Sequence, residues 1–141
     1  MVVIDADGAV VGRLGARVAK LLLSGTTVEV INAEKAVMLG SLSATKAKYL
    51  SRKGQKDKRS PEHSPKWPKP PHLFLRRIMR GMLPWSRQRG RDAYHRLKVE
   101  LGSPDGMGKP VKIKEASADG KHGYFTLAEL SKELGYQSKT G

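Results

Sequence analysis

The sequence predicts an α/β protein with a small, mainly parallel sheet. Short runs of β-branched and aliphatic residues alternate along the chain with segments whose apolar residues recur every three or four positions. Such alternation favours parallel strands that are connected by helices. The 141 residues are 38% hydrophobic, which suffices for one modest core but not for two full ones. We therefore expect a single α/β domain that spans 1–141.

The first 40 residues carry the clearest alternation of strand and helix. Asp7-Gly8 is a turn signal, and Gly25 is a helix stop. Between them, apolar residues at helical spacing predict an amphipathic helix of about three turns. The predicted elements are a strand at Val2–Ile4, this helix at 10–22, and two further strands at Thr27–Ile31 and Ala36–Leu39.

Four more helices and two weaker strands are predicted beyond residue 42. Ser43 is the expected N-cap of the first helix, whose Ala44, Ala47, Tyr49 and Leu50 are expected to face inward. Thr126 and Glu129 have the spacing of a capping box, which marks the start of the last helix. The helices are expected at 43–54, 73–81, 87–96 and 127–134, and the strands at 97–101 and around Ile113.

The segment Gln55–Pro71 is expected to be an extended arm or a long loop. It is rich in Lys, Arg, Ser and Pro and has almost no aliphatic side chains, so it lacks the apolar surface needed to bury itself. Structureless stretches of this length in a compact domain usually have a binding role.

The positive charge of the protein is confined to one segment. The chain carries 27 basic and 13 acidic side chains, a formal net charge of +14. Residues 46–98 hold 17 of the basic side chains and 3 of the acidic ones, so this basic segment accounts for the whole excess. The regions on either side of it are each neutral. One strongly positive element on a neutral scaffold indicates a polyanion as the binding partner.

The basic segment also contains five of the eight aromatic residues. Lys and Arg neutralise phosphates, and aromatic and guanidinium planes stack on exposed bases, so this mixture fits RNA binding. For Tyr49, Phe74 and Trp85 the alternative is a role as core anchors, in which case only the charge is functional. The expected RNA-binding residues are Lys46, Lys48, Arg52, Lys53, Lys56, Lys58, Arg59, Lys66, Trp67, Lys69, Arg76, Arg77, Arg80, Trp85, Arg87, Arg89, Arg91 and Arg96.

One glycine pattern resembles a nucleotide-binding turn. Gly8, Gly12 and Gly15 follow a predicted strand and open a predicted helix, but their spacing is wrong for a dinucleotide fingerprint and no Walker lysine follows. The alternative is structural: a tight turn at Gly8, with Gly12 and Gly15 letting the helix approach the sheet closely. We expect no nucleotide cofactor.

Nothing in the sequence predicts catalysis, a metal site or membrane insertion. No cysteine is present, and the four histidines do not pair at metal-ligand spacing. The acidic residues of the basic segment are too scattered to hold Mg²⁺ for a nuclease. No apolar run approaches the ~20 residues that span a bilayer, and the acidic N-terminus is unlike a secretory signal. We expect no enzyme activity, cofactor, metal, small-molecule substrate or membrane partner.

Several short motifs follow one another in a defined order along the chain. They are Val-Ile-Asp-Ala at 3–6 with Gly-Arg-Leu after it, Val-Ile-Asn-Ala-Glu-Lys at 30–35, Tyr-Leu at 49–50, Arg-Gly-Met-Leu-Pro at 80–84 and Arg-Leu-Lys-Val at 96–99. Together they resemble the family of the thirteenth protein of the large ribosomal subunit, and the spacing of Arg-Gly-Met-Leu-Pro is similar to that of its archaeal branch. The resemblance covers Val3 to about Pro104, and beyond it only the Thr-Leu-Ala-Glu-Leu helix at 126–130 matches.

The resemblance implies a three-layer α/β/α fold around a parallel sheet of about four strands, with a basic loop and helix extension. It also implies a non-enzymatic structural component of the large ribosomal subunit, which binds ribosomal RNA and stabilises its folding during assembly. The implied partners are large-subunit ribosomal RNA and neighbouring ribosomal proteins, and the implied location is the cytoplasmic ribosome. From the residues alone two alternatives stay open: a DNA-binding regulatory protein, and a nucleotide-binding enzyme that uses the turn at Gly8–Gly15.

Overall fold

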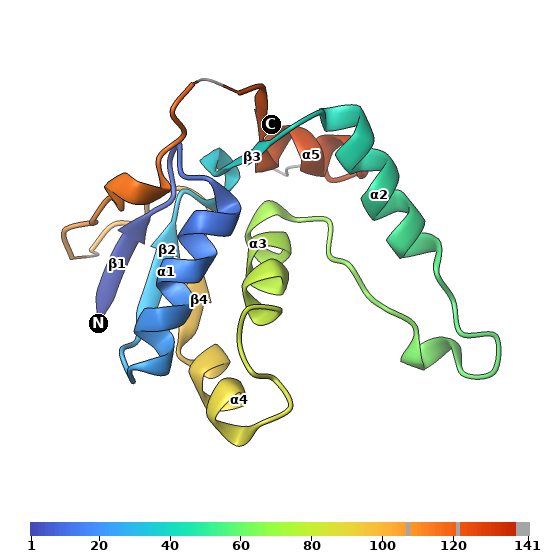
Figure 1. Ribbon diagram of the computed structural model, residues 1–141, viewed down its shortest axis with the longest axis horizontal. Helices are drawn as coiled ribbons and strands as arrows, with labels where there is room; N and C mark the ends of the chain where they lie inside the picture. Colours follow the sequence, from blue (N-terminus) through green and yellow to red (C-terminus); the bar gives the residue numbers. More distant parts are fainter. Residues whose placement is uncertain (107, 121, 138–141) are drawn as a thin grey trace.

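The computed structural model describes residues 1–106, 108–120 and 122–137, and it has the predicted α/β fold (Figure 1). The strands are β1 (Val2–Asp5), β2 (Val28–Ile31), β3 (Val37–Leu39), β4 (Leu97–Val99) and β5 (Tyr124–Thr126). The α-helices are α1 (Val11–Leu23), α2 (Leu42–Gly54), α3 (Pro71–Arg80), α4 (Gln88–His95) and α5 (Leu127–Glu133), and the 3₁₀ turns are η1 (Ala33–Lys35), η2 (Pro61–His63) and η3 (Lys114–Ala116). Within the described ranges, no helix has the length and apolarity to cross a lipid bilayer.

The central sheet consists of β1, β2 and β4 in the order β1-β2-β4, and all its strand pairs are parallel. Ile4 pairs with Val30, and Val30 pairs with Val99, so these side chains share one face of the sheet and enter the hydrophobic core. The sheet thus has three strands, whereas about four were expected. The position beside β1 is occupied by a single parallel bridge from Ile4 to Val111, two residues before the weak strand predicted around Ile113.

β3 does not join the parallel sheet. It pairs antiparallel with β5, with Met38 opposite Phe125, and β5 is a strand that the sequence did not reveal. Only the five residues 32–36 separate β2 from β3, whereas a crossover to a parallel neighbour needs a dozen residues or more. The chain therefore turns away after β2, and β3 finds its partner near the other end of the chain.

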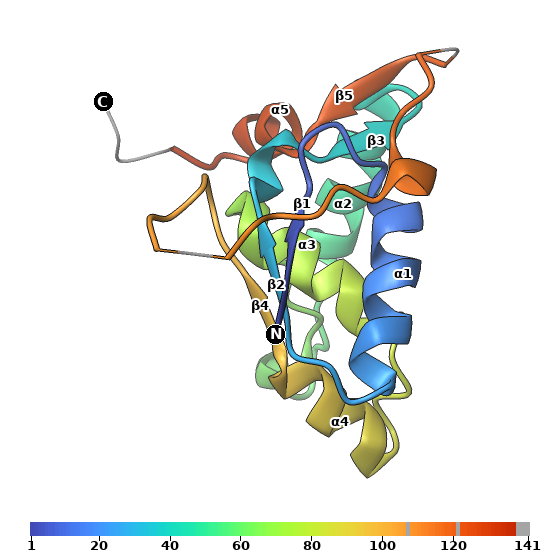
Figure 2. The same cartoon turned by 90° about the vertical axis from the view of Figure 1, so that its left-hand side faces the viewer.

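Helices α1 and α3 lie on the same face of the parallel sheet, as Figure 2 shows. α1 buries Leu14, Val18 and Leu22 at the helical spacing predicted from the sequence. α3 buries Leu75 and Met79 in the same way and contacts both α1 and β4. These two apolar stripes and the inward face of the sheet form the hydrophobic core.

The loop after α3 packs closely on two glycines. A Cβ atom on Gly15 of α1 would lie 2.6 Å from Sδ of Met82 in this loop, and a Cβ atom on Gly90 of α4 would overlap the carbonyl group of Pro84. Gly15 therefore admits the loop after α3, not the sheet as predicted. The same prediction is wrong for Gly12, because a Cβ there would have no neighbour within 4 Å.

α2 differs from its prediction at its start and in its orientation. The helix begins at Leu42 with Ser41 as N-cap, and Ser43 lies in its first turn. Tyr49 is the one residue of α2 that is buried. The helix lies away from the parallel sheet and contacts α5, so one aromatic anchor replaces an apolar stripe (Figure 1). Tyr49 was predicted to face inward and is buried, whereas the other side chains of that prediction are exposed: Ala44, Ala47 and Leu50.

The predicted capping box starts α5. The amide of Glu129 donates a hydrogen bond to Oγ1 of Thr126 (3.3 Å), and the amide of Thr126 donates to Oε2 of Glu129 (3.1 Å). α5 is in turn joined to α2 by an ion pair between Glu133 and Lys46, whose Oε2 and Nζ atoms are 2.8 Å apart. Both side chains are more than a third exposed, so the pair adds a modest contact between α5 and α2.

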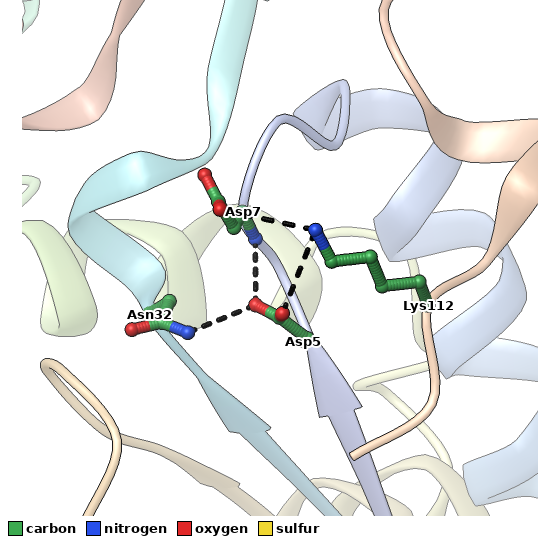
Figure 3. A network of polar contacts seen from close by, with 4 residues as sticks. All are labelled: Asp5, Asp7, Asn32 and Lys112. Atoms are coloured by element: carbon green, nitrogen blue, oxygen red, sulfur yellow. Dashed lines mark hydrogen bonds and ion pairs between the residues drawn. The ribbon is translucent and has the colours of Figure 1, made fainter.

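Asp5 joins the carboxyl ends of β1 and β2 (Figure 3). Its Oδ1 accepts hydrogen bonds from Nδ2 of Asn32 (2.9 Å) and from the amide of Asp7 (3.0 Å), and Nζ of Lys112 lies 3.8 Å from its Oδ2. Desolvation raises the pKa of Asp5, but the two hydrogen bonds and the charge of Lys112 outweigh it, so the pKa lies below its ordinary value. Asn32 adopts a left-handed backbone with a φ of 55°.

Replacing Asn32 by alanine is expected to lower the free energy of unfolding by about 3 kcal/mol, because it removes a hydrogen bond to a carboxylate and strains the left-handed backbone. Asn32→Gly is the matched control: it loses the hydrogen bond without the strain, so about 2 kcal/mol is expected. Urea unfolding at neutral pH measures both losses. Equal losses in the two variants would contradict the strain.

The stability lost in Asn32→Gly is expected to depend on pH. The pKa of Asp5 is lower in the folded than in the unfolded protein. The stability gained from its carboxylate is therefore complete above the unfolded pKa of about 3.9 and is lost as the pH falls through the folded value. The difference in stability between Asn32→Gly and the unmodified protein is expected to shrink over that acidic range.

Candidate nucleic-acid interface

The basic segment 46–98 forms α2, the following loop, α3, α4 and β4 up to Lys98. We call residues 55–70 the arm, since Pro71 already begins α3, and η2 is its regular element. Figure 1 shows α2 and the arm projecting away from the parallel sheet, with α3 between this projection and the sheet. The positive charge is therefore displayed on the projection and on the helices α3 and α4.

Side-chain hydrogen bonds close the tip of the arm. The amide of Asp57 donates to Oγ of Ser64 (2.8 Å), and Oδ1 of Asp57 accepts from the amide of Arg59 (2.9 Å). The cations on either side of this turn, Lys56, Lys58 and Arg59, are exposed. One of the few acidic residues of the basic segment thus organises the turn that presents them.

Three aromatic rings anchor the arm to α2 and α3. The centroid of Tyr49 lies 5.1 Å from that of Trp67 and 4.8 Å from that of Phe74. Tyr49 and Phe74 are 5% and 1% exposed, so the alternative of core anchors holds for both. The guanidinium carbons of Arg77 and Arg52 lie 4.7 Å and 5.3 Å from the centroid of Trp67. We call these five residues the arm cluster.

A second group of rings lies between α3 and α4. Trp85 and Tyr94 meet edge to face, with centroids 5.2 Å apart and ring planes at 90°. The guanidinium of Arg80 lies over Trp85 at 4.2 Å, and that of Arg76 lies over Tyr94 at 4.5 Å. We call these four residues the α4 cluster. The three arginines of α3 therefore belong to two clusters, because Arg77 contacts the arm.

Two lysines meet where the arm returns to the core. Removal from solvent, and next the positive charge of Lys69, lower the pKa of Lys53 below its ordinary value. Lys53 is in the last turn of α2, and Lys69 is near the end of the arm. Two cations held side by side repel each other, and an anion bound beside them relieves that repulsion.

Two of the arginines predicted to bind RNA also contact the backbone of α1. Nη2 of Arg96 donates a hydrogen bond to the carbonyl of Leu22 (2.7 Å), and Nη2 of Arg89 donates to that of Leu23 (3.2 Å). Carbonyls in the last turn of a helix lack intrahelical partners and carry partial negative charge, so these cations stabilise the end of α1.

The eighteen predicted site residues divide evenly by exposure, and none is buried. Half of them are partly exposed, among them the two tryptophans and the four arginines of the clusters. The fully exposed half consists of Lys48, Lys56, Lys58, Arg59, Lys66, Lys69, Arg87, Arg89 and Arg91.

The glycine turn before α1 is the tight turn of the structural alternative, since Gly8 has a φ of 71°. Its amides are engaged within the fold: Gly8 donates to the carbonyl of Lys35 (3.2 Å), and Val10 donates to that of Ala116 (2.7 Å). A phosphate-binding loop needs such amides to point at the ligand. The turn therefore fixes the start of α1 against its neighbours.

Tyr49 and Tyr94 are the two rings of the clusters that contact an arginine and that the predicted site omitted. Both contact guanidinium groups, Tyr49 that of Arg52 and Tyr94 that of Arg76. The mixture of basic and aromatic residues was visible in the sequence. The pairing of Arg76 with Tyr94 was not, because the two residues come from different helices, whereas Tyr49 and Arg52 are three positions apart in α2.

The fold and this surface define a basic α/β protein whose positive charge lies on a helical extension of a neutral core. Its family is identified by comparison with known proteins. Residues 1–105 match the model of the family described as Ribosomal protein L13, so the chain belongs to this family.

Curated relatives match nearly the whole chain. A protein of Methanopyrus kandleri named large ribosomal subunit protein uL13 is 42% identical over 145 residues, which cover 99% of this chain and 89% of the relative. Proteins of the same name from Methanococcus maripaludis and Archaeoglobus fulgidus are 43% and 42% identical, and each alignment covers 96% of this chain and 98% or 88% of the relative. The resemblance to the archaeal branch is thereby confirmed.

Proposed function

We propose that this protein is a structural component of the large ribosomal subunit that binds ribosomal RNA and stabilises its folding during assembly. The observation that carries the proposal is the placement of the whole net charge of +14 on residues 46–98, in a chain of the L13 family. The relatives are named as proteins of the large ribosomal subunit. The role is that of a binding protein without catalysis, located on the cytoplasmic ribosome.

Binding rests on charge neutralisation at the RNA backbone. Lys and Arg side chains that contact phosphates release condensed counterions, which supplies a large part of the affinity. The projection of α2 and the arm and the helices α3 and α4 display these side chains in different directions from one core (Figure 1). Such a surface contacts several RNA segments at once and holds them together, as a clamp does.

The neutral parts of the protein are suited to a second kind of neighbour. Residues 1–45 and 99–141 carry no net charge, so they do not attract a polyanion and their surface is available for other contacts. Several apolar side chains outside the basic segment are exposed, including Leu39, Leu101 and Tyr124. We propose that neighbouring proteins of the large subunit pack on this part of the surface.

Sedimentation of a cell lysate on a sucrose gradient tests the proposed function. The protein is expected to migrate with the large ribosomal subunit at moderate salt, and to leave it at high salt or after RNase treatment, because both remove the phosphate contacts. A predominantly free pool under moderate salt would contradict the proposal. So would a large-subunit association that survives RNase.

A further inference from the structure

The arginines of the basic segment differ in what holds them. Arg52, Arg76, Arg77 and Arg80 each lie over an aromatic ring, at distances of 4.2–5.3 Å from guanidinium carbon to centroid. None of the four forms an ion pair with a carboxylate of the described residues. Arg89 and Arg96, by contrast, each donate a hydrogen bond to a carbonyl of α1.

This difference decides which donors are available to a ligand. A guanidinium that stacks on a ring is held by its face, so its in-plane N–H groups stay free for an acceptor. Arg76 and Arg80 illustrate this, since their guanidiniums lie over Tyr94 and Trp85 and form no ion pair within the described residues. A free planar fork of N–H donors matches the two non-bridging oxygens of a phosphodiester.

In the same geometry, the faces of the tryptophan rings are in contact with arginines. Trp67 is in contact with two guanidiniums and with the rings of Tyr49 and Phe74. Trp85 has the guanidinium of Arg80 over its face and forms an edge-to-face pair with Tyr94. A nucleobase that stacked on these faces would have to displace an arginine.

We propose that Trp67, Trp85, Tyr49 and Tyr94 are positioning residues, which hold four arginines ready for phosphodiester groups of RNA and do not themselves stack on bases. This inference rests on the proposed RNA-binding function and makes it specific. It replaces the expectation that Trp67 and Trp85 contact RNA directly. It also ranks the arginines: the four ring-held ones bind phosphate, and Arg89 and Arg96 stabilise α1.

The two clusters form two separate phosphate-binding patches. Arg76 and Arg80 are one helical turn apart and belong to the α4 cluster, whereas Arg77 projects from a different side of α3 into the arm cluster. α3 therefore lies between two stretches of RNA backbone. Losses of affinity from Arg76→Gln with Arg80→Gln and from Arg52→Gln with Arg77→Gln are expected to multiply when combined.

A double-mutant cycle on Arg80 and Trp85 tests the positioning role. The full chain is titrated against large-subunit ribosomal RNA in a filter-binding assay over a series of salt concentrations. Arg80→Gln is expected to weaken binding roughly tenfold. Trp85→Leu is expected to weaken it about two- to fivefold with an unchanged salt slope, because no charge is removed.

The combined variant distinguishes the two roles of the ring. If Trp85 acts through Arg80, Trp85→Leu costs no further affinity in the Arg80→Gln background. If Trp85 stacks on a base, Trp85→Leu weakens binding by the same factor in the Arg80→Gln background as in the unmodified protein, and the positioning role is wrong. Should Trp85→Leu fail to fold, as judged by circular dichroism, Tyr94→Leu with Arg76→Gln provides the same cycle at the neighbouring pair.

Two matched variants complete the experiment. Arg91→Gln removes one charge from an exposed arginine that has no ring partner in the described residues, and is expected to cost less affinity than Arg80→Gln. Arg80→Lys keeps the charge but loses the planar fork, so it is expected to lose affinity at an unchanged salt slope. Equal losses in Arg91→Gln and Arg80→Gln would overturn the ranking. If the unmodified protein does not bind the RNA, the proposed function itself fails.

Protection of the RNA from hydroxyl radicals tests the two patches. Neutralising the α4 cluster and neutralising the arm cluster are expected to remove protection at different stretches of the RNA. Loss of the same stretch in both variants would show a single patch and overturn this part of the inference.

Discussion

Alanine at position 90 is expected to lower the free energy of unfolding by about 3 kcal/mol or more. The new Cβ atom would overlap the carbonyl group of Pro84 and lie 3.0 Å from its nitrogen. These are backbone atoms, so relief requires α4 to move away from the loop after α3. That movement also disturbs the contact of Tyr94 with Trp85 and the bond from Arg89 to the end of α1. Urea unfolding followed by circular dichroism measures the loss.

Gly12 and Gly15, both in α1, provide matched controls for Gly90→Ala in α4. At Gly15 the added methyl group meets the end of the Met82 side chain, which moves aside, so a loss of about 1 kcal/mol is expected. At Gly12 it meets nothing within 4 Å, and alanine is expected to stabilise the helix by about 0.5–1 kcal/mol. The free energy of unfolding is expected to be highest for Gly12→Ala, lower for Gly15→Ala and lowest for Gly90→Ala. A Gly90→Ala variant as stable as the unmodified protein would contradict the close packing of α4 on the loop.

Neutralising Arg76, Arg77 and Arg80 together is expected to weaken binding to ribosomal RNA by ~100-fold or more at moderate salt. If about eight of the basic side chains contact phosphates, log K falls against log salt with a slope of roughly −6 to −7 in the unmodified protein. Removing three of these contacts is expected to reduce the steepness by about 2–3. Large subunits purified from cells that make the triple variant are expected to contain less of this protein than subunits from cells with the unmodified protein.

A variant of equal charge separates specific contacts from bulk electrostatics. Lys20, Lys109 and Lys114 are exposed and lie outside the basic segment. Their combined replacement by glutamine lowers the net charge by the same amount, and it is expected to change the slope by less than 1. An unchanged slope in the triple arginine variant, with its fold intact by circular dichroism, would contradict the assignment of these contacts.

Local sequence patterns predicted much of the fold, because the elements that they describe are stabilised locally. The stripe of Leu14, Val18 and Leu22 in α1 and the capping box of α5 are where the sequence placed them. The strand β5 was missed, since its three residues gain stability from β3 and not from their neighbours. The prediction for α2 failed for a related reason: its Leu50 has the right spacing to be buried, but no layer covers that side.

The composition of the interface was predictable, but the role of each residue was not. Charge segregation located residues 46–98 without any structure. Whether an arginine faces a ligand or caps a helix depends on what lies beside it in space. Arg96 and Arg80 look alike in sequence, yet one donates to the carbonyl of Leu22 and the other lies over Trp85. Such assignments depend on contacts between residues that are distant in the chain.

The ion pair between Lys46 and Glu133 has a consequence for the order in which the protein is built. Its partners are 87 positions apart, and β3 likewise pairs with a strand near the other end of the chain. Contacts over such separations form late, because closing long loops costs chain entropy. A ribosome synthesises α2, the arm and α3 well before α5, so the growing chain exposes a cationic projection that the rings of Tyr49, Trp67 and Phe74 can hold but that still lacks its contact with α5. The contact between α5 and α2 forms only after residues 124–133 have been made, so the projection is completed by a segment that is translated long after it.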